Sequence, residues 1–91
     1  MSVLSEIFGD RPQAKIVEAF AENHDDKLYI ADIVRMTGVS KATVYKHLNK
    51  LVAEGIVEEK GRAGNIRFFQ LNPSSPKAKI ILMLERFIIS E

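Results

Sequence analysis

The chain contains no cysteine, no tryptophan and only two histidines among its 91 residues. Without cysteine it has neither a disulfide framework nor a thiolate metal site. Catalytic signatures are missing as well, because the sequence offers no nucleophile with a base, no carboxylate pair in a cleft motif and no phosphate-cradling glycine loop. Gly61 and Gly64 are better explained as turn residues of a hairpin. We therefore expect a protein that is not an enzyme and that carries no metal and no cofactor.

Long hydrophobic runs are absent too. No uninterrupted apolar stretch reaches the roughly 20 residues that cross a bilayer, and the N-terminus lacks the basic and apolar regions of a signal peptide. A length of 91 residues corresponds to one domain. We expect a single cytoplasmic domain over residues 1–91 with no membrane partner.

Neither sign of charge predominates in the whole chain, since the formal net charge is only +1. The distribution is nevertheless uneven. Residues 1–36 hold four basic and seven acidic side chains, whereas residues 37–91 hold nine basic and five acidic ones. The positive excess therefore lies in the second part of the chain, where it predicts a modest phosphate-binding footprint.

Two short helical patterns meet at Gly38-Val39-Ser40. Gly38 can adopt the left-handed conformation that ends a helix, and Ser40 is a natural N-cap for the next one. The apolar residues on both sides of this turn are spaced so that they face one core: Ile33, Val39, Val44, Leu48 and Leu51. The pattern predicts a helix-turn-helix.

The second helix of this motif has an outer face of short, hydrogen-bonding and basic residues. No acidic residue occurs between Ser40 and Ala53. Such a face suits the major groove of double-stranded DNA, which must be entered closely while phosphates are neutralised. The alternative is an ordinary solvated helix face of a small domain.

Strand patterns follow the motif. Ile56-Val57 begins one run, and Ile66 to Leu71 forms another after the turn-rich segment Lys60 to Asn65. These segments predict a β-hairpin with a basic tip. Upstream, Leu28-Tyr29-Ile30 is expected to add a short strand to the same sheet, and a helix is expected to begin around Pro12.

Together these segments resemble the winged helix-turn-helix family, in particular the small prokaryotic regulators related to the MarR and ArsR groups. The resemblance covers about Arg11 to Leu71 and is carried by Gly38-Val39-Ser40, Thr43 to Leu48 and Glu54 to Val57. It implies a DNA-binding transcriptional regulator of the α+β class, mainly helical, with a three-helix core and a β-hairpin wing over residues 11–72. With only two histidines, His24 and His47, a metal-sensing version is not expected.

The resemblance also implies roles for individual residues. The helix that starts near Ser40 would be the recognition helix, and the hairpin would be the wing. The expected base-edge readers are Lys41, Ala42 and Lys46, with Tyr45 beside them. The expected phosphate contacts of the helix are Ser40, Thr43 and Lys50. The expected wing contacts are Lys60, Arg62, Asn65 and Arg67.

The segment 75–90 predicts one more helix, with Ser75 as its cap and Pro76 in its first turn. This helix is apolar on nearly all sides, and a domain of this size can cover only one of them. We expect it to pair with the same helix of a second copy and so to form a homodimer. The expected interface residues are Ile80, Ile81, Leu84, Phe87 and Ile88. The alternative is that the helix packs entirely on its own domain.

A two-fold dimer would set two recognition helices about one turn of DNA apart, roughly 34 Å, and would favour an inverted-repeat operator. We therefore expect a nucleoid-associated, sequence-specific double-stranded DNA-binding regulator, and the resemblance favours repression. The alternative is a winged-helix module that makes protein contacts within a transcription or nucleic-acid-processing complex. The sequence leaves open the operator and whether a small-molecule effector exists.

Overall fold

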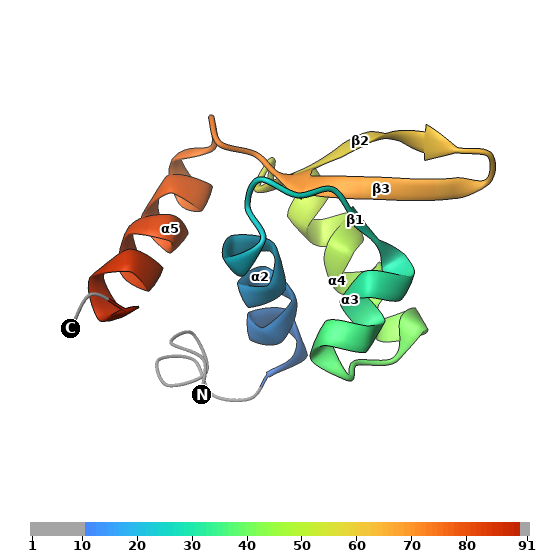
Figure 1. Cartoon of the computed structure of the whole chain (residues 1–91), viewed down its shortest axis with the longest axis horizontal. Helices are drawn as coiled ribbons and strands as arrows, with labels where there is room; N and C mark the ends of the chain where they lie inside the picture. The colour runs from blue at the N-terminus through green and yellow to red at the C-terminus, as the bar shows by residue number, and fades with distance from the viewer. Residues whose placement is uncertain (1–10, 90–91) are drawn as a thin grey trace.

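The computed structural model describes the backbone of residues 11–89 and the side chains of residues 11–84. In chain order the elements are helix α2 (Pro12–Glu22), strand β1 (Leu28–Tyr29), helix α3 (Ile30–Thr37), helix α4 (Lys41–Ala53), strand β2 (Val57–Ala63), strand β3 (Ile66–Leu71) and helix α5 (Pro76–Ile89). Helices α2, α3 and α4 lie together on one side of the sheet, and α5 lies at the end of the molecule away from the hairpin (Figure 1). This is the expected α+β winged helix-turn-helix with an added C-terminal helix.

The core lies where α2, α3 and α4 pack against one another and against the base of the sheet. All five apolar residues that the sequence assigns to the helix-turn-helix core are buried. They are joined by Ile16 and Phe20 of α2 and by Phe69 and Leu71 of β3. The predicted core is therefore confirmed, and it holds the second helix of the motif against the other two.

The turn between α3 and α4 has the predicted conformation. Gly38 has a φ of 71° and its amide donates to the Val34 carbonyl at 2.8 Å, which ends α3. The Thr37 hydroxyl donates to the Ile33 carbonyl at 2.6 Å and accepts from the Val39 amide at 3.1 Å. These bonds satisfy backbone groups that the end of a helix leaves open, so the angle between the two helices is well determined.

The sheet is antiparallel in the order β1-β3-β2. The predicted short strand is confirmed for Leu28, which pairs with Phe69, and for Tyr29, which pairs with Phe68. Ile30, however, is the first residue of α3 instead of a strand residue. The Asp32 carboxylate explains this boundary, because its Oδ2 accepts from the Tyr29 amide at 2.9 Å and so caps the first turn of the helix.

The hairpin tip is shorter than the sequence indicates. Strand β2 continues through Lys60 and Arg62 to Ala63, and only Gly64 and Asn65 connect it to β3. A register shift between Glu59 and Gly61 accommodates the extra residue Lys60, after which pairing resumes with Phe68 and Arg67. The expectation of a basic tip was therefore wrong: the cations lie along the two strands, and the tip itself is uncharged.

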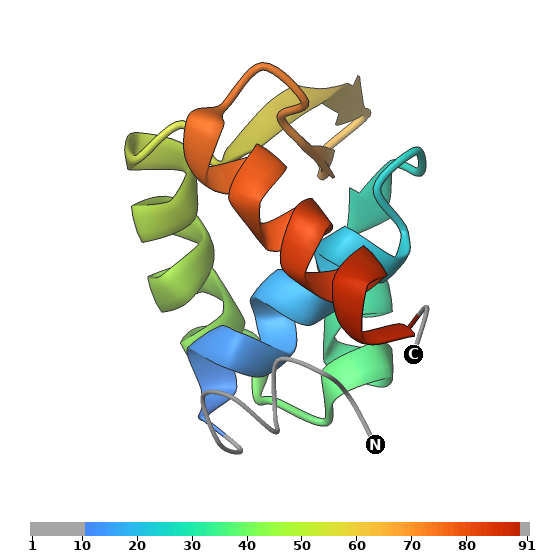
Figure 2. The ribbon, with the colours of Figure 1, turned by 90° about the vertical axis from the view of Figure 1, so that its left-hand side faces the viewer.

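Helix α5 begins as predicted. The Ser75 hydroxyl accepts from the Ala78 amide at 3.2 Å, and Pro76 occupies the first turn. The helix packs on α2 through buried Ala78, and Ile81 lies half-buried against the core. Figure 2, which looks onto α5, shows no other described helix or strand in front of it. Within residues 11–89, no helix is long and apolar enough to cross a membrane.

Candidate nucleic-acid interface

Helix α4 presents the face that the sequence assigns to DNA. Lys41, Ala42, Lys46 and Lys50 are all exposed, while Val44, Leu48 and Leu51 are buried on the opposite side. None of the three lysines forms an ion pair with a carboxylate in the described part of the chain. Their ammonium groups are therefore not shared with a carboxylate there and are available to an anionic partner.

Ser40 and Thr43 have a structural task at the start of α4. The Ser40 Oγ accepts from the Thr43 amide at 3.3 Å and lies 2.9 Å from the Thr43 Oγ1. This pair caps the recognition helix and fixes where it begins. Both residues lie at the N-terminal end of α4, as a phosphate contact there would require, but their hydroxyls are already hydrogen-bonded to each other.

The wing cations are not equivalent. Lys60 Nζ lies 3.4 Å from the Glu58 carboxylate, and Arg67 is paired with Glu59. Arg62 is exposed and forms no ion pair with a carboxylate among residues 11–84. Asn65, the fourth predicted wing contact, is exposed at the tip. Arg62 is therefore the wing cation that is most available to a phosphate.

Sequence reasoning did not find the ion pairs that partly neutralise the wing. The pairing of Arg67 with Glu59 depends on the register between β2 and β3, which the bulge shifts. The sequence signal for such a pair is the presence of acidic residues in one strand and a basic residue in the other, and this signal does not fix the register that brings them together. Arg35 of α3, which lines the same hollow as Lys41 and Tyr45 of α4, is not among the residues that the sequence assigns to DNA.

A groove of about 510 Å³ separates the recognition helix from the wing. Lys41 and Tyr45 of α4 line one side, and Asn65 and Arg67 of the hairpin line another. Helix α3 forms the remaining wall, with Arg35 of its last turn among the lining residues. Four predicted contacts of the helix and wing, Lys41, Tyr45, Asn65 and Arg67, thus meet at one concave surface that α3 completes.

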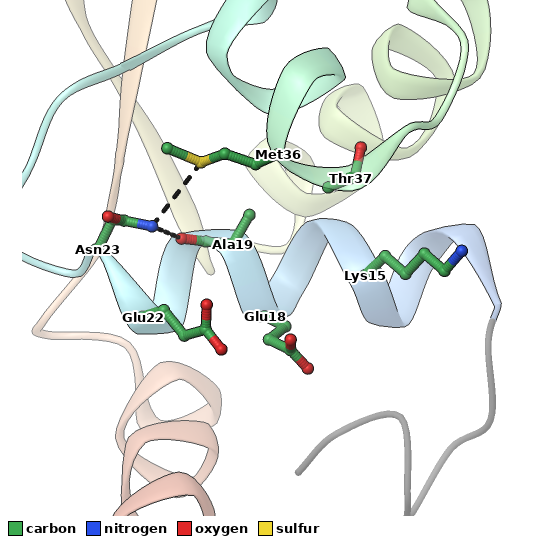
Figure 3. Close-up of a pocket in the computed structure, with 7 residues that line it drawn as sticks. All are labelled: Lys15, Glu18, Ala19, Glu22, Asn23, Met36 and Thr37. Atoms are coloured by element: carbon green, nitrogen blue, oxygen red, sulfur yellow. Dashed lines mark hydrogen bonds between the residues drawn. The ribbon is translucent and has the colours of Figure 1, made fainter. Parts of the chain in front are cut away.

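A second hollow, of about 400 Å³, lies between α2 and the end of α3 (Figure 3). Its lining includes Lys15, Glu18 and Glu22 of α2, together with Met36 and Thr37 of α3. The Asn23 Nδ2 donates to the Ala19 carbonyl at 2.8 Å and lies 3.8 Å from the Met36 sulfur. Two carboxylates make this surface unsuited to phosphates, so it is separate from the basic face.

The expected dimer residues fall into three groups. Ile80 is 57% exposed, and its neighbour Met83, which the sequence analysis did not include, is 68% exposed. Ile81 and Leu84 are half-buried, and Ile81 contacts the core of its own domain. The side chains of Phe87 and Ile88 lie outside the described residues. Helix α5 therefore covers its own domain with one face and leaves an apolar strip on another.

No group of three or more His, Asp or Glu side chains within residues 11–84 is arranged to hold a metal ion. His24 lies in the loop after α2, with its Nε2 3.7 Å from the Asp25 carboxylate. His47 is half-buried on the flank of α4.

The three-helix core, the three-stranded wing sheet and the acid-free recognition helix define the class as a winged helix-turn-helix protein. The family model described as bacterial regulatory protein, arsR family, matches residues 10–59, which is more than half of the chain. The chain therefore belongs to the arsR family, a family of DNA-binding transcriptional regulators and not of enzymes. This confirms the ArsR resemblance that the sequence motifs carry.

Solved structures agree on the fold. The chain is similar to reduced HlyU from Vibrio cholerae N16961, with a TM-score of 0.69 and 19% identity over 98% of this chain and 87% of that one. It is also similar to the ferric uptake regulator from Francisella tularensis with iron, with a TM-score of 0.62 and 26% identity over 70% of this chain. The chain spans about half the length of the latter protein, 52%. No curated protein matches the chain.

Proposed function

We propose that this arsR-family chain is a cytoplasmic homodimeric repressor that binds an inverted-repeat operator in double-stranded DNA and reads its sequence with α4. The observation that carries the proposal is the exposed, acid-free face of α4, whose three lysines pair with no carboxylate among residues 11–84, because that face can enter a major groove without charge repulsion. Lys41, Ala42 and Lys46 are the proposed base readers. Lys50 and Arg62 are the proposed phosphate contacts.

The small net charge argues for a dimer. A chain with a formal charge of +1 gains little affinity from non-specific phosphate attraction, so two linked half-sites raise operator affinity more effectively than one. The exposed Ile80 and Met83 of α5 supply an apolar strip that a second copy would cover. A two-fold axis through this strip would relate two recognition helices and would match an inverted repeat.

Repression follows from occupancy alone. A dimer seated on an inverted repeat close to a promoter covers DNA that the polymerase needs, and it requires no further domain to do so. Such a protein would be found with the nucleoid in the cytoplasm.

The test is selection of duplexes from a random DNA pool by the purified full chain at near-physiological salt. We expect enrichment of an inverted repeat with half-sites about one helical turn apart, and protection of that site in a footprint. Binding that shows no sequence enrichment and vanishes as salt rises would contradict the proposal, and it would favour a winged helix that makes protein contacts. Enrichment of a single half-site would contradict the dimer but retain the reader helix.

A further inference from the structure

The groove between α3, α4 and the hairpin has a position that constrains what fills it. Its opposite sides belong to the recognition helix, through Lys41 and Tyr45, and to the wing, through Asn65 and Arg67. In B-form DNA the major and minor grooves alternate, and a single sugar–phosphate strand separates one from the next. When α4 lies in a major groove and the wing lies over the adjacent minor groove, that strand must pass between them.

We infer that this groove holds the sugar–phosphate strand, and that Arg35 of α3 is a phosphate contact that the Asp32 carboxylate holds in position. The inference rests on the proposed DNA-binding function and adds α3 to the interface. The inference gives α3, which forms the third wall of the groove, a role in DNA binding that the assignments to α4 and the wing do not include.

The chemistry of the groove matches a DNA strand. Arg35 and Arg67 supply cations around it, which suits phosphate oxygens, and Lys41, a proposed base reader, lines the side that belongs to α4. Ile30 and Val34 contribute apolar surface from α3, which suits the carbon atoms of deoxyribose. Ile66 adds a large apolar side chain that is 58% exposed. A deoxyribose ring packed on Ile66 would remove from water an apolar side chain that is exposed in the free protein.

The Asp32 carboxylate orients Arg35 at this wall. Its Oδ2 accepts from the Tyr29 amide at 2.9 Å, and its Oδ1 accepts from the Arg35 Nη2 at 3.2 Å. Both carboxylate oxygens of Asp32 are thus hydrogen-bonded in the first turn of α3, which begins directly after the last residue of β1. The guanidinium keeps other N–H donors for a phosphate, and its side chain is 70% exposed. Asp32 is a positioning residue, and Arg35 makes the contact.

The experiment measures operator affinity of the full chain against salt for the wild type, Arg35→Ala and Arg35→Lys. We expect Arg35→Ala to weaken specific and non-specific duplexes alike by about 3- to 10-fold and to reduce the slope of log K against log salt by about 0.9, the value for one phosphate. Arg35→Lys keeps the charge, so the slope should stay near that of the wild type. Phosphate-ethylation interference should lose one position in Arg35→Ala, on the strand between the half-site and the flanking minor groove.

Lys77→Ala is the matched control. Like Arg35, Lys77 is an exposed cation in a surface ion pair, with its Nζ 3.8 Å from Glu54, but it lies in the first turn of α5, away from the hairpin tip (Figure 1). Its loss changes the net charge by the same amount and should leave the slope and the interference pattern unchanged.

The outcomes separate the two claims. A wild-type slope and interference pattern in Arg35→Ala, with operator binding intact in the wild type, would overturn the role of α3 and leave the proposed function standing. Absence of salt-dependent binding in the wild type would overturn both. Equal losses in Arg35→Ala and Lys77→Ala would show a general charge effect and would also overturn the contact.

Discussion

Arg67 of β3 forms an ion pair with Glu59 of β2, and its guanidinium carbon lies 5.1 Å from the centre of the Phe69 ring. A cation that the sequence assigns to DNA is therefore shared with a carboxylate and held over an aromatic ring of the core. The pair places negative charge within the wing, so it limits the attraction of the wing for phosphates.

Replacement of Glu59 tests this limit. We expect Glu59→Gln to raise DNA affinity about 2- to 5-fold at low salt, because it removes the negative charge beside Arg67 and leaves the guanidinium available to a phosphate. The free energy of unfolding should change by less than about 1 kcal/mol, as for other exposed ion pairs. Glu22→Gln in α2 is the control, since it changes the net charge equally but lies in the acidic hollow of Figure 3. Equal gains from both variants would contradict a local effect in the wing.

The proposed function divides the lysines and arginines of α4 and the wing into base readers and phosphate contacts. We expect Lys46→Ala to reduce discrimination between operator and non-operator sites by about 1–3 kcal/mol, because Lys46 is a proposed base reader. Arg62→Ala should weaken all duplexes similarly and flatten the salt slope. Competition titrations with matched and scrambled duplexes distinguish the two effects. Unchanged discrimination in Lys46→Ala would remove Lys46 from the readers.

The dimer can be tested at Met83, which is 68% exposed and therefore tolerates a charge in the monomer. Leu84 is half-buried, so a glutamate there would also disturb the fold. We expect Met83→Glu to sediment as a monomer and to lose at least about tenfold in affinity for a full inverted repeat while it keeps single half-site binding. Lys77→Glu adds a carboxylate to an exposed position of α5 that lies six residues from Met83, on a different side of the helix, and should remain dimeric. An unchanged dimer in Met83→Glu would remove this strip from the interface.

The bulge in β2 gives a prediction about stability. A Cβ on Gly61 would lie 3.0 Å from the Phe68 Cζ, and its φ of 153° is rarely adopted by other residues. We expect Gly61→Ala to lower the free energy of unfolding by about 2–4 kcal/mol, from backbone strain and overpacking together. Gly64→Ala at the tip, with a φ of 65° and no atom within 4 Å of its Cβ, should cost only about 1–2 kcal/mol. Urea titrations of both variants provide the comparison, and equal costs would show that the Phe68 ring yields without penalty.

The helix-turn-helix could be predicted from sequence because its signals act locally. Gly38 ends α3 through its own φ, and Ser40 caps α4 through an amide three residues away. The spacing of Val44, Leu48 and Leu51 fixes the buried face of the same helix. Each of these choices depends on neighbours within one or two turns.

Features that depend on contacts between distant segments were not predictable in the same way. The sequence shows Lys60, Gly61 and Arg62 as turn residues, but a one-residue bulge keeps them in a strand. The burial of α5 depends on how much of its surface packs against α2. The spacing of apolar residues along α5 does not give that area. Arg35 was overlooked because its place beside the wing arises from the pairing of β1 with β3, across about 40 residues of chain.

Strand β1 contains only two residues, yet it connects the helix-turn-helix to the hairpin, the two parts that are proposed to contact DNA. Tyr29 pairs with Phe68 in the sheet, its ring lies edge-on to the Phe68 ring at 5.6 Å, and its amide is held by Asp32 of α3. The Gln70 side chain also donates to the His24 carbonyl at 3.3 Å. These contacts join the helix pair to the hairpin, and we expect them to limit rotation of one against the other. When α4 lies on its bases, the wing would then have to fit the minor groove beside them. The width and the helical position of that minor groove would therefore affect binding, and operators would be distinguished partly by the shape of DNA whose bases are not read.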